Sequence, residues 1–256
     1  MFHKATALQT YQLSSLDGEM GKVKEFYFDD RSWAIRYLIA DTGTWLRGRQ
    51  VLISPHALDA ASRDDEQIAI HLSTRQIEES PSLATDKPVS RQFEEEYHGY
   101  YGWSDQWMGG FPLMGTDPAV GLNPAWDTPS AEISPTHTPK EDWDPHLRST
   151  EEVRGSDIEA SDGELGHVED FIVEDDQWTI RYLVIDTKNW WPGKRVLISP
   201  QWIERVSWAD SKVIVNLTQA EIKAFPEFTD EALLNGEYEG GLHEDYQRKA
   251  AASLIA

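Results

Sequence analysis

The sequence predicts an all-β protein made of two small barrels in tandem, with a long, mostly irregular linker and a short helical piece after each barrel. Residues 17–55 and 162–200 align without a gap, with roughly half of the positions identical, which marks a duplicated folding unit. Each copy reads as short apolar-polar alternations separated by turns, the pattern of strands. The stretch between the copies is rich in Gly, Pro, Ser and Thr and has no such period.

The repeat extends beyond Pro55, because Ile68–Leu72 matches Val213–Leu217 with the same offset. Each unit then covers about 75 residues, a size at which a small domain can fold alone. Residues kept in both copies, such as Gly21/Gly166 and Trp33/Trp178, are predicted to be those that a barrel needs to close. We expect four regions: a first barrel at 1–80, a helical and aromatic segment with a flexible linker at 81–148, a second barrel at 149–227, and an acidic tail at 228–256.

The first two strands of each unit are predicted to form a hairpin. In the first copy, residues 21–28 alternate apolar and polar side chains, which places Val23, Phe26 and Phe28 near a core. Residues 29–32 are a polar turn, and residues 33–40 are rich in aromatic and branched side chains that favour strands.

Shorter elements follow in the same order. Residues 50–54 form an apolar strand that Pro55 ends, and residues 67–72 form another after an acidic turn. Residues 73–77 and 218–222 each read as one helical turn, capped by Ser73 or Thr218. Several short strands with turns between them are typical of a small barrel.

The charge restricts the possible partners. The formal net charge is −22, and more than half of it falls in residues 151–256. Such a field repels phosphate backbones and anionic membrane surfaces, so we expect no nucleic acid and no direct membrane insertion. Protein partners with basic surfaces, or cations, are more compatible with it. Solubility, or life in a saline host, explains the same acidity.

Other bulk features indicate a cytoplasmic protein. Cysteine is absent, which excludes disulfides, thiolate metal sites and a cysteine nucleophile. The first 15 residues lack the apolar core of a signal peptide. No run approaches the roughly 18 apolar residues that a membrane span requires.

No pattern in the sequence supports catalysis, a cofactor or a metal. The acidic turns 29–30 and 174–176 offer carboxylates to a hard cation, but they fall short of a full ligand set, and Asp is common in turns. The eight histidines form no HxH or HExxH spacing. The Ser54-Pro55 and Ser199-Pro200 pairs lack the surroundings of a nucleophile. We therefore predict that the protein is not an enzyme.

The best candidate contact surface is the loop that follows the second predicted strand of each copy. Exposed tryptophans mark interfaces, and both loops also carry basic residues. The alternatives are a barrel lid and a contact between the two repeats. The candidate partner-binding residues are Trp45, Arg47, Arg49, Trp190, Trp191, Lys194 and Arg195.

Two further features have a structural and a functional interpretation. Arg36 and Arg181 occupy the same strand position. Each either pairs with the nearby Asp41 or Asp186, lies on a solvent face, or is presented to a partner carboxylate. The aromatic cluster within residues 97–107 is either a recognition element or a cover for an edge strand of the first barrel.

These motifs resemble the PRC-barrel family. The resemblance rests on Asp17-Gly18 with Gly21, the acidic turn, Trp33, Arg36-Tyr37-Leu38, Asp41-Thr42 and Val51 to Pro55, and on the same residues of the second copy. The family includes the cytoplasmic barrel of the H subunit of photosynthetic reaction centres and the C-terminal barrel of a ribosome-maturation factor. The resemblance implies the barrel fold for both repeats and leaves the linker and the C-terminus unexplained.

The expected function is that of a non-catalytic protein-interaction or assembly module. The barrels are expected to self-associate, either as a pair within one chain or as a homodimer. The resemblance suggests two alternatives: a component or assembly factor of a photosynthetic or membrane electron-transfer complex, and a ribosome-associated factor that binds a basic protein.

Overall fold

The structure is a computed structural model, and it describes residues 1–43, 51–81, 97–102, 144, 146–187, 194–208 and 210–230. The chain divides into two compact units. One unit holds residues 1–86 and 146–256, and therefore both repeats, and the other holds residues 87–145. In the smaller unit, residues 97–101 form a helical turn in which the rings of Tyr97 and Tyr101 lie 5.0 Å apart. Most of the predicted linker, the rest of the aromatic cluster and most of the acidic tail lie outside the described residues.

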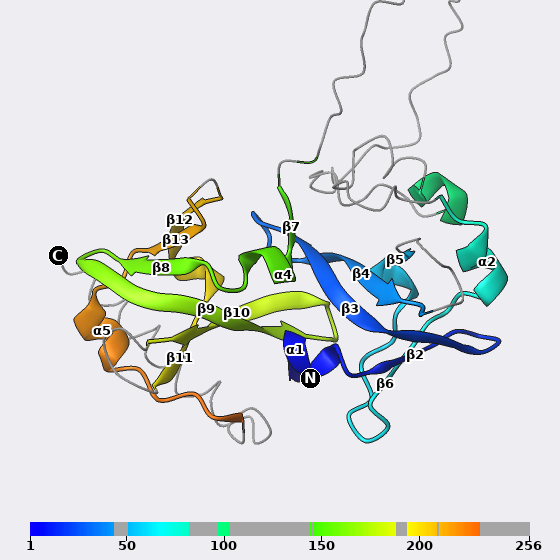
Figure 1. The fold of residues 1–256 in the computed structure, drawn as a ribbon, viewed down its shortest axis with the longest axis horizontal. Coiled ribbons are helices and arrows are strands. Elements are labelled where there is room, and N and C mark those ends of the chain that lie inside the picture. The colour runs from blue at the N-terminus through cyan, green and yellow to red at the C-terminus, as the bar shows by residue number, and fades with distance from the viewer. Residues whose placement is uncertain are drawn as a thin grey trace, which may run out of the picture. The chain divides into compact units, whose positions relative to one another are not determined.

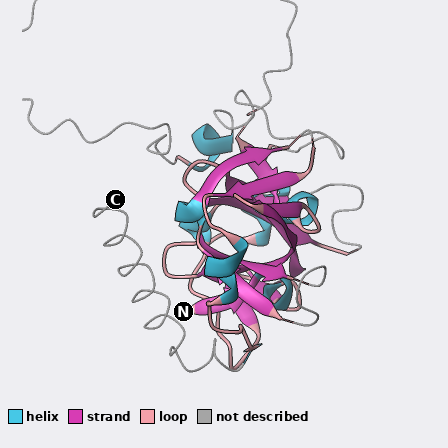
Figure 2. Ribbon diagram, turned by 90° about the vertical axis from the view of Figure 1, so that its left-hand side faces the viewer, coloured by secondary structure: helices cyan, strands magenta, loops and turns pink. Residues whose placement is uncertain are grey.

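Two β-sheets, one for each repeat, confirm the predicted fold class (Figure 1). Figure 2 shows the strands curving around their interior. The first sheet has the order β5-β4-β3-β2-β6. Its strands are β2 (Gln12–Ser14), β3 (Glu19–Asp29), β4 (Ile35–Asp41), β5 (Val51–Ile53) and β6 (Gln67–Ala69).

The second sheet repeats this order and adds one strand at its end, β11-β10-β9-β8-β13-β12. The counterparts of β12 in the first repeat, Leu58 and Ser62, make isolated bridges only. The strands are β8 (Asp157–Ala160), β9 (Gly163–Glu174), β10 (Thr179–Asp186), β11 (Arg195–Ile198), β12 (Ile203–Ser207) and β13 (Lys212–Val215).

The predicted hairpin is present in both repeats. β3 pairs antiparallel with β4, and β9 with β10, and both ladders contain two register irregularities, which bend long strands around a barrel. The predicted helical turns are also confirmed. Helices α2 (Thr74–Glu78) and α5 (Gln219–Lys223) begin with capping boxes whose N-caps are Ser73 and Thr218.

The structural repeat begins earlier than the sequence repeat. A short strand and a helix precede β2, namely β1 (Phe2–Lys4) and α1 (Ala5–Leu8). With the same offset of 145, β7 (Leu147–Ser149) and α4 (Thr150–Val153) precede β8. Residues 2–16 and 147–161 share no identical position, so the alignment of the two copies misses these elements.

The first strand of each repeat joins the sheet of the other repeat. β1 pairs antiparallel with β9, and β7 pairs antiparallel with β3. The registers are equivalent, because Phe2 lies opposite Glu174 and Leu147 lies opposite Asp29. A third contact is an antiparallel bridge between Ala34 and Thr179, which are themselves counterparts. We call these three contacts, with the side chains around them, the seam, and its symmetry is that of a two-fold axis through the Ala34–Thr179 pair.

A glycine near the start of the long strand in each repeat lies against the backbone of the neighbouring hairpin strand. A Cβ on Gly21 would lie 2.0 Å from the carbonyl oxygen of Asp41, and a Cβ on Gly166 would lie 2.0 Å from that of Asp186. Both glycines also have φ angles, +126° and +157°, that side chains rarely adopt. The glycines therefore allow each long strand to pass close to the end of its hairpin partner.

We expect Gly21→Ala to lower the free energy of unfolding by at least about 2 kcal/mol, because backbone strain and a steric clash act together. Urea denaturation measures this change. Gly18→Ala is the matched control, since a Cβ on Gly18 meets nothing within 4 Å. Its effect should stay within about 0.5 kcal/mol. Equal losses in the two variants would contradict the role of the close approach.

Candidate functional site

The predicted partner-binding residues divide into two groups. Trp45, Arg47, Arg49, Trp190 and Trp191 lie outside the described residues. Lys194 and Arg195 are described, at the start of β11.

Lys194 and Arg195 both contact the chain that follows α5. The ammonium group of Lys194 donates hydrogen bonds to the carbonyls of Lys223 and Phe225, each at 2.8 Å. The guanidinium of Arg195 lies 5.5 Å from the ring centroid of Phe228 and 3.6 Å from a carboxylate oxygen of Asp230. These two cations therefore hold the end of the second repeat in place, in addition to any role toward a partner.

Phe228 anchors the chain that follows α5 to the second sheet. Its side chain is fully buried with Ile172, Val184 and Leu197, and Phe2 and Tyr182 pack against the same cluster. The Phe228 N–H also donates to the Arg195 carbonyl at 2.8 Å. Phe228 thus covers part of the second sheet, next to Phe2 of β1.

Arg36 and Arg181 pair with acidic residues other than the predicted ones. The guanidinium of Arg181 donates to Glu174 at 2.6 Å, and that of Arg36 lies 3.8 Å from Asp29. The structural interpretation of these arginines agrees with the ion pairs, but Asp41 and Asp186 are not the partners, because five positions along a strand place two side chains on opposite faces. The true partners lie across the hairpin on the neighbouring strand, and they are counterparts of each other.

The seam is the most elaborate arrangement of polar and aromatic groups in the described residues. At its centre, the Ile35 N–H donates to the Trp178 carbonyl and the Ile180 N–H donates to the Trp33 carbonyl, both at 2.8 Å. Trp33 and Trp178 have φ angles of 60° and 48°, unusual for a bulky residue. Such a conformation costs on the order of 1–2 kcal/mol, and the reciprocal hydrogen bonds and ring burial offset it.

Aromatic rings fill the space around these hydrogen bonds. Phe26 lies 6.0 Å from Trp178, and Phe28 lies 5.9 Å from Phe171, so rings of the two repeats contact each other. Phe28 also stacks on Trp33 at 5.2 Å. The tryptophans kept in both copies were predicted to close each barrel. In the structure they join the two barrels as well.

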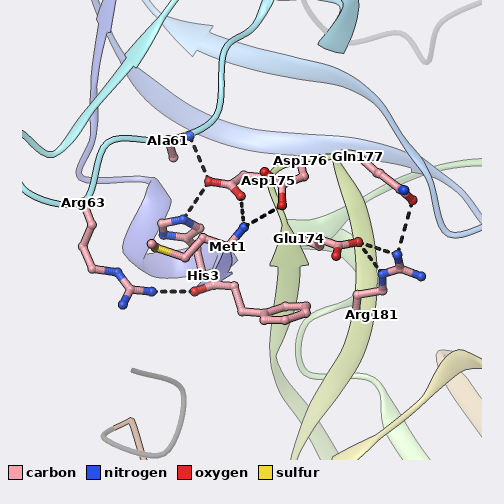
Figure 3. A network of polar contacts seen from close by, with 10 residues as sticks. Met1, His3, Ala61, Arg63, Glu174, Asp175, Asp176, Gln177 and Arg181 are labelled. Carbon is pink, nitrogen blue, oxygen red and sulfur yellow. Dashed lines mark hydrogen bonds and ion pairs between the residues drawn. The ribbon is translucent and has the colours of Figure 1, made fainter. Parts of the chain in front are cut away.

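A carboxylate lies on each side of this aromatic centre: Asp175 is buried, and the Asp30 side chain is 10% exposed. Asp175, which is 1% exposed, accepts a hydrogen bond from the backbone N–H of Ala61 at 3.0 Å, lies 3.0 Å from the Nε2 atom of His3, and pairs with the amino group of Met1 (Figure 3). Burial by itself would raise the pKa of Asp175. The hydrogen bonds and charges of His3 and of the amino group outweigh it and lower the pKa to about 2.

Asp30 is the counterpart of Asp175, and its surroundings repeat the arrangement with different side chains. His146 Nδ1 lies 2.9 Å from one carboxylate oxygen. Trp208 Nε1 donates to the other at 2.7 Å, and Arg148 donates to that same oxygen at 3.4 Å. The Arg148 guanidinium also lies 4.5 Å above the Trp208 ring. His146 and Arg148 occupy the positions equivalent to Met1 and His3. The carboxylate therefore has donors at the same positions in both repeats, but they come from different residue types.

A second pair of carboxylates binds the first helix of the opposite repeat. Asp170 accepts from the backbone N–H of Thr6 at 3.2 Å and from its hydroxyl, and burial raises the pKa of Asp170. Its counterpart, Glu25, accepts from the hydroxyl of Ser149. Each carboxylate therefore anchors the exchanged strand and helix of the other repeat.

The chemistry of the seam is that of an interface. Its buried carboxylates are satisfied by cations and N–H donors from the opposite repeat, the arrangement that makes burial of a charge tolerable. Within the described residues, no group of three or more His, Asp or Glu side chains is placed to hold a metal ion. No helix in that part of the chain is long and apolar enough to span a bilayer.

Sequence reasoning did not find the seam. In the sequence, Asp29-Asp30 and Asp175-Asp176 have the pattern of turn residues or of cation ligands. Their partners come from the first strand of the opposite repeat, where the copies share no identity. The shared turn sequence with Trp33 and Trp178 was the one available signal.

Comparison with known families agrees with this architecture. Residues 147–222 match the family model of the PRC-barrel domain. The second repeat is therefore a PRC-barrel domain, and the match begins at Leu147, the first residue of β7. The first repeat has the same strand order, β5-β4-β3-β2-β6, so it shares the fold of the second repeat. A comparison with curated proteins found no match.

We expect Asp175→Asn to lower the free energy of unfolding by about 2 kcal/mol at pH 7, the equivalent of the lowered pKa. Because that pKa is depressed, the carboxylate stabilises the fold above its ordinary pKa near 3.8 and loses this effect as the pH falls toward 2. The difference between wild type and variant should shrink to about half at pH 3.

Urea denaturation of both proteins between pH 3 and pH 7 measures this difference. Asp176→Asn is the matched control, because the Asp176 side chain is 70% exposed, and it should change stability by less than about 0.5 kcal/mol. A difference between wild type and Asp175→Asn that does not depend on pH would contradict the assignment.

Proposed function

We propose that the protein is a non-catalytic protein-interaction and assembly module of the cytoplasm, built from two barrels that the seam holds together. The observation that carries this proposal is that each candidate loop follows the end of β4 or β10 that is distant from the Ala34–Thr179 pair. β4 and β10 both begin beside the Ala34–Thr179 pair and run away from it for seven and eight residues. At roughly 3.3 Å per residue, they end some 20 Å or more along the strands from the axis.

The two candidate loops follow these far ends. Residues 44–50 come after Gly43 and residues 188–193 come after Thr187. The reciprocal hydrogen bonds and the bridge that join the two tryptophan turns lie at the opposite ends of β4 and β10. This favours contacts of Trp45 and Trp190 with a partner over the alternative in which they join the two repeats.

A pair of related loops on one chain suits an adaptor. Two sites on a connected frame raise the effective concentration of the second binding event once the first has occurred. The loops are basic and aromatic, while the rest of the chain is strongly acidic. Aromatic residues would supply affinity, and the acidic field would attract partners with basic surfaces.

We expect the double variant Trp45→Ala/Trp190→Ala to retain at least tenfold less partner than wild type, because buried tryptophans dominate most interfaces. The measurement is co-purification from the native host, with the captured proteins identified and quantified. Reaction-centre or ribosomal proteins among them would select one of the two alternative roles suggested by the resemblance.

Leu16→Ala is the control, since it removes an apolar side chain that is 68% exposed on the turn before β3. It should leave capture unchanged. Thermal melting separates binding from folding. The double variant could melt well below wild type yet capture the same partners per folded molecule. In that case Trp45 and Trp190 are packing residues and the proposal is wrong.

A further inference from the structure

The seam has the form of an interface between two separate molecules. Its contacts come in pairs related by the pseudo-two-fold axis: β1 on β9 with β7 on β3, the two hydrogen bonds between the tryptophan turns, and the two carboxylate clusters. Isologous contacts of this kind are the rule in two-fold dimers. Here both halves belong to one chain.

The seam does not depend on which chain supplies its second half. Within the part of the chain that the structure describes, repeat 1 ends by Pro81 and repeat 2 begins by His146, and all seam contacts are noncovalent. The connection between them has roughly 60 residues, and at about 3.3–3.6 Å each it could span on the order of 200 Å when extended. Chain length therefore does not restrict a repeat to the partner repeat of its own chain.

An isolated repeat leaves several groups of the seam without the partners that the other repeat supplies. Without a partner repeat, β1 and β7 lose their ladders, and Asp175 and Asp30 lose the donors that compensate their burial. The reciprocal hydrogen bonds of the strained Trp33 and Trp178 are lost as well. Each repeat thus has a strong requirement for a partner repeat, which is the situation that leads to domain exchange.

We propose that the seam is an exchangeable interface through which two copies of this chain form a reciprocal dimer. Repeat 1 of each copy pairs with repeat 2 of the other, so the dimer contains two complete seams and four barrels. No contact is lost in the exchange. The balance between monomer and dimer depends on protein concentration relative to the effective concentration that the covalent connection gives the two repeats of one chain. This proposal does not depend on the partner discussed above.

The axis pair provides a direct test, because the chain contains no cysteine. The hydrogen bonds flank Ala34 and Thr179, so this is a non-hydrogen-bonded antiparallel pair, in which opposed Cα atoms lie about 4.5 Å apart. That separation is within the roughly 4.4–6.8 Å that a disulfide requires. Ala34→Cys and Thr179→Cys can therefore report which chains share a seam.

The experiment refolds the full-length single variants A34C and T179C, separately and mixed, at about 5 μM and about 1 mM, followed by oxidation. We expect a cross-linked dimer from the mixture, at least tenfold more abundant at the higher concentration, and none from either variant alone. The double variant A34C/T179C, refolded at the lower concentration, should form the bond within one chain.

Three outcomes would overturn the proposal. The mixture gives no cross-linked dimer at 1 mM although the double variant closes its internal bond. A34C alone cross-links as well as the mixture does, which would mean that like repeats pair. If the double variant forms no bond, light scattering of the unmodified chain decides: a mass of 29.2 kDa at both concentrations overturns the exchange, and twice that mass after refolding at 1 mM supports it.

Discussion

The pairing of two equivalent turns across a pseudo-two-fold axis is the constraint on which the rest of the structure depends. Trp33 and Trp178 adopt left-handed backbone conformations that a bulky side chain tolerates only when its surroundings require them. Each turn supplies a carbonyl to the opposite repeat and a ring to the shared aromatic centre. Because these turns are hairpin ends, their pairing sets where β4 and β10 begin and therefore where both barrels point.

Around this centre, the two repeats use the same geometry with different chemistry. Asp30 and Asp175 occupy equivalent positions, yet one is satisfied by an indole, an imidazole and a guanidinium, and the other by an imidazole, an amino group and a backbone N–H. A buried carboxylate demands donors but does not specify which residue provides them. The two copies of the seam could therefore diverge to no residual identity in β1 and β7 while the register of both strands stayed the same.

Features that depend on local sequence could be predicted, whereas those that depend on contacts between the repeats could not. Hairpins, their turns, the strand that Pro55 ends and the helices capped by Ser73 and Thr218 follow from local patterns and were predicted correctly. The exchange of β1 and β7 was not predicted, because a strand of three residues carries almost no periodic signal and the partner strands lie about 170 and about 120 positions away. Arg36 and Arg181 form ion pairs across the hairpin, and the local pattern offered only Asp41 and Asp186 along the strand as acidic partners.

The sequence by itself determined that the chain contains a duplicated β-rich unit, the second copy of which matches the PRC-barrel model, since repetition and strand periodicity are local properties of the chain. Only the tertiary structure decided what joins the two units. Tryptophans and acidic turns shared by the copies are consistent with barrel closure, with turn geometry and with an interface. Contact between residues far apart in the chain selected the interface, because burial and hydrogen-bond partners are properties of the folded molecule.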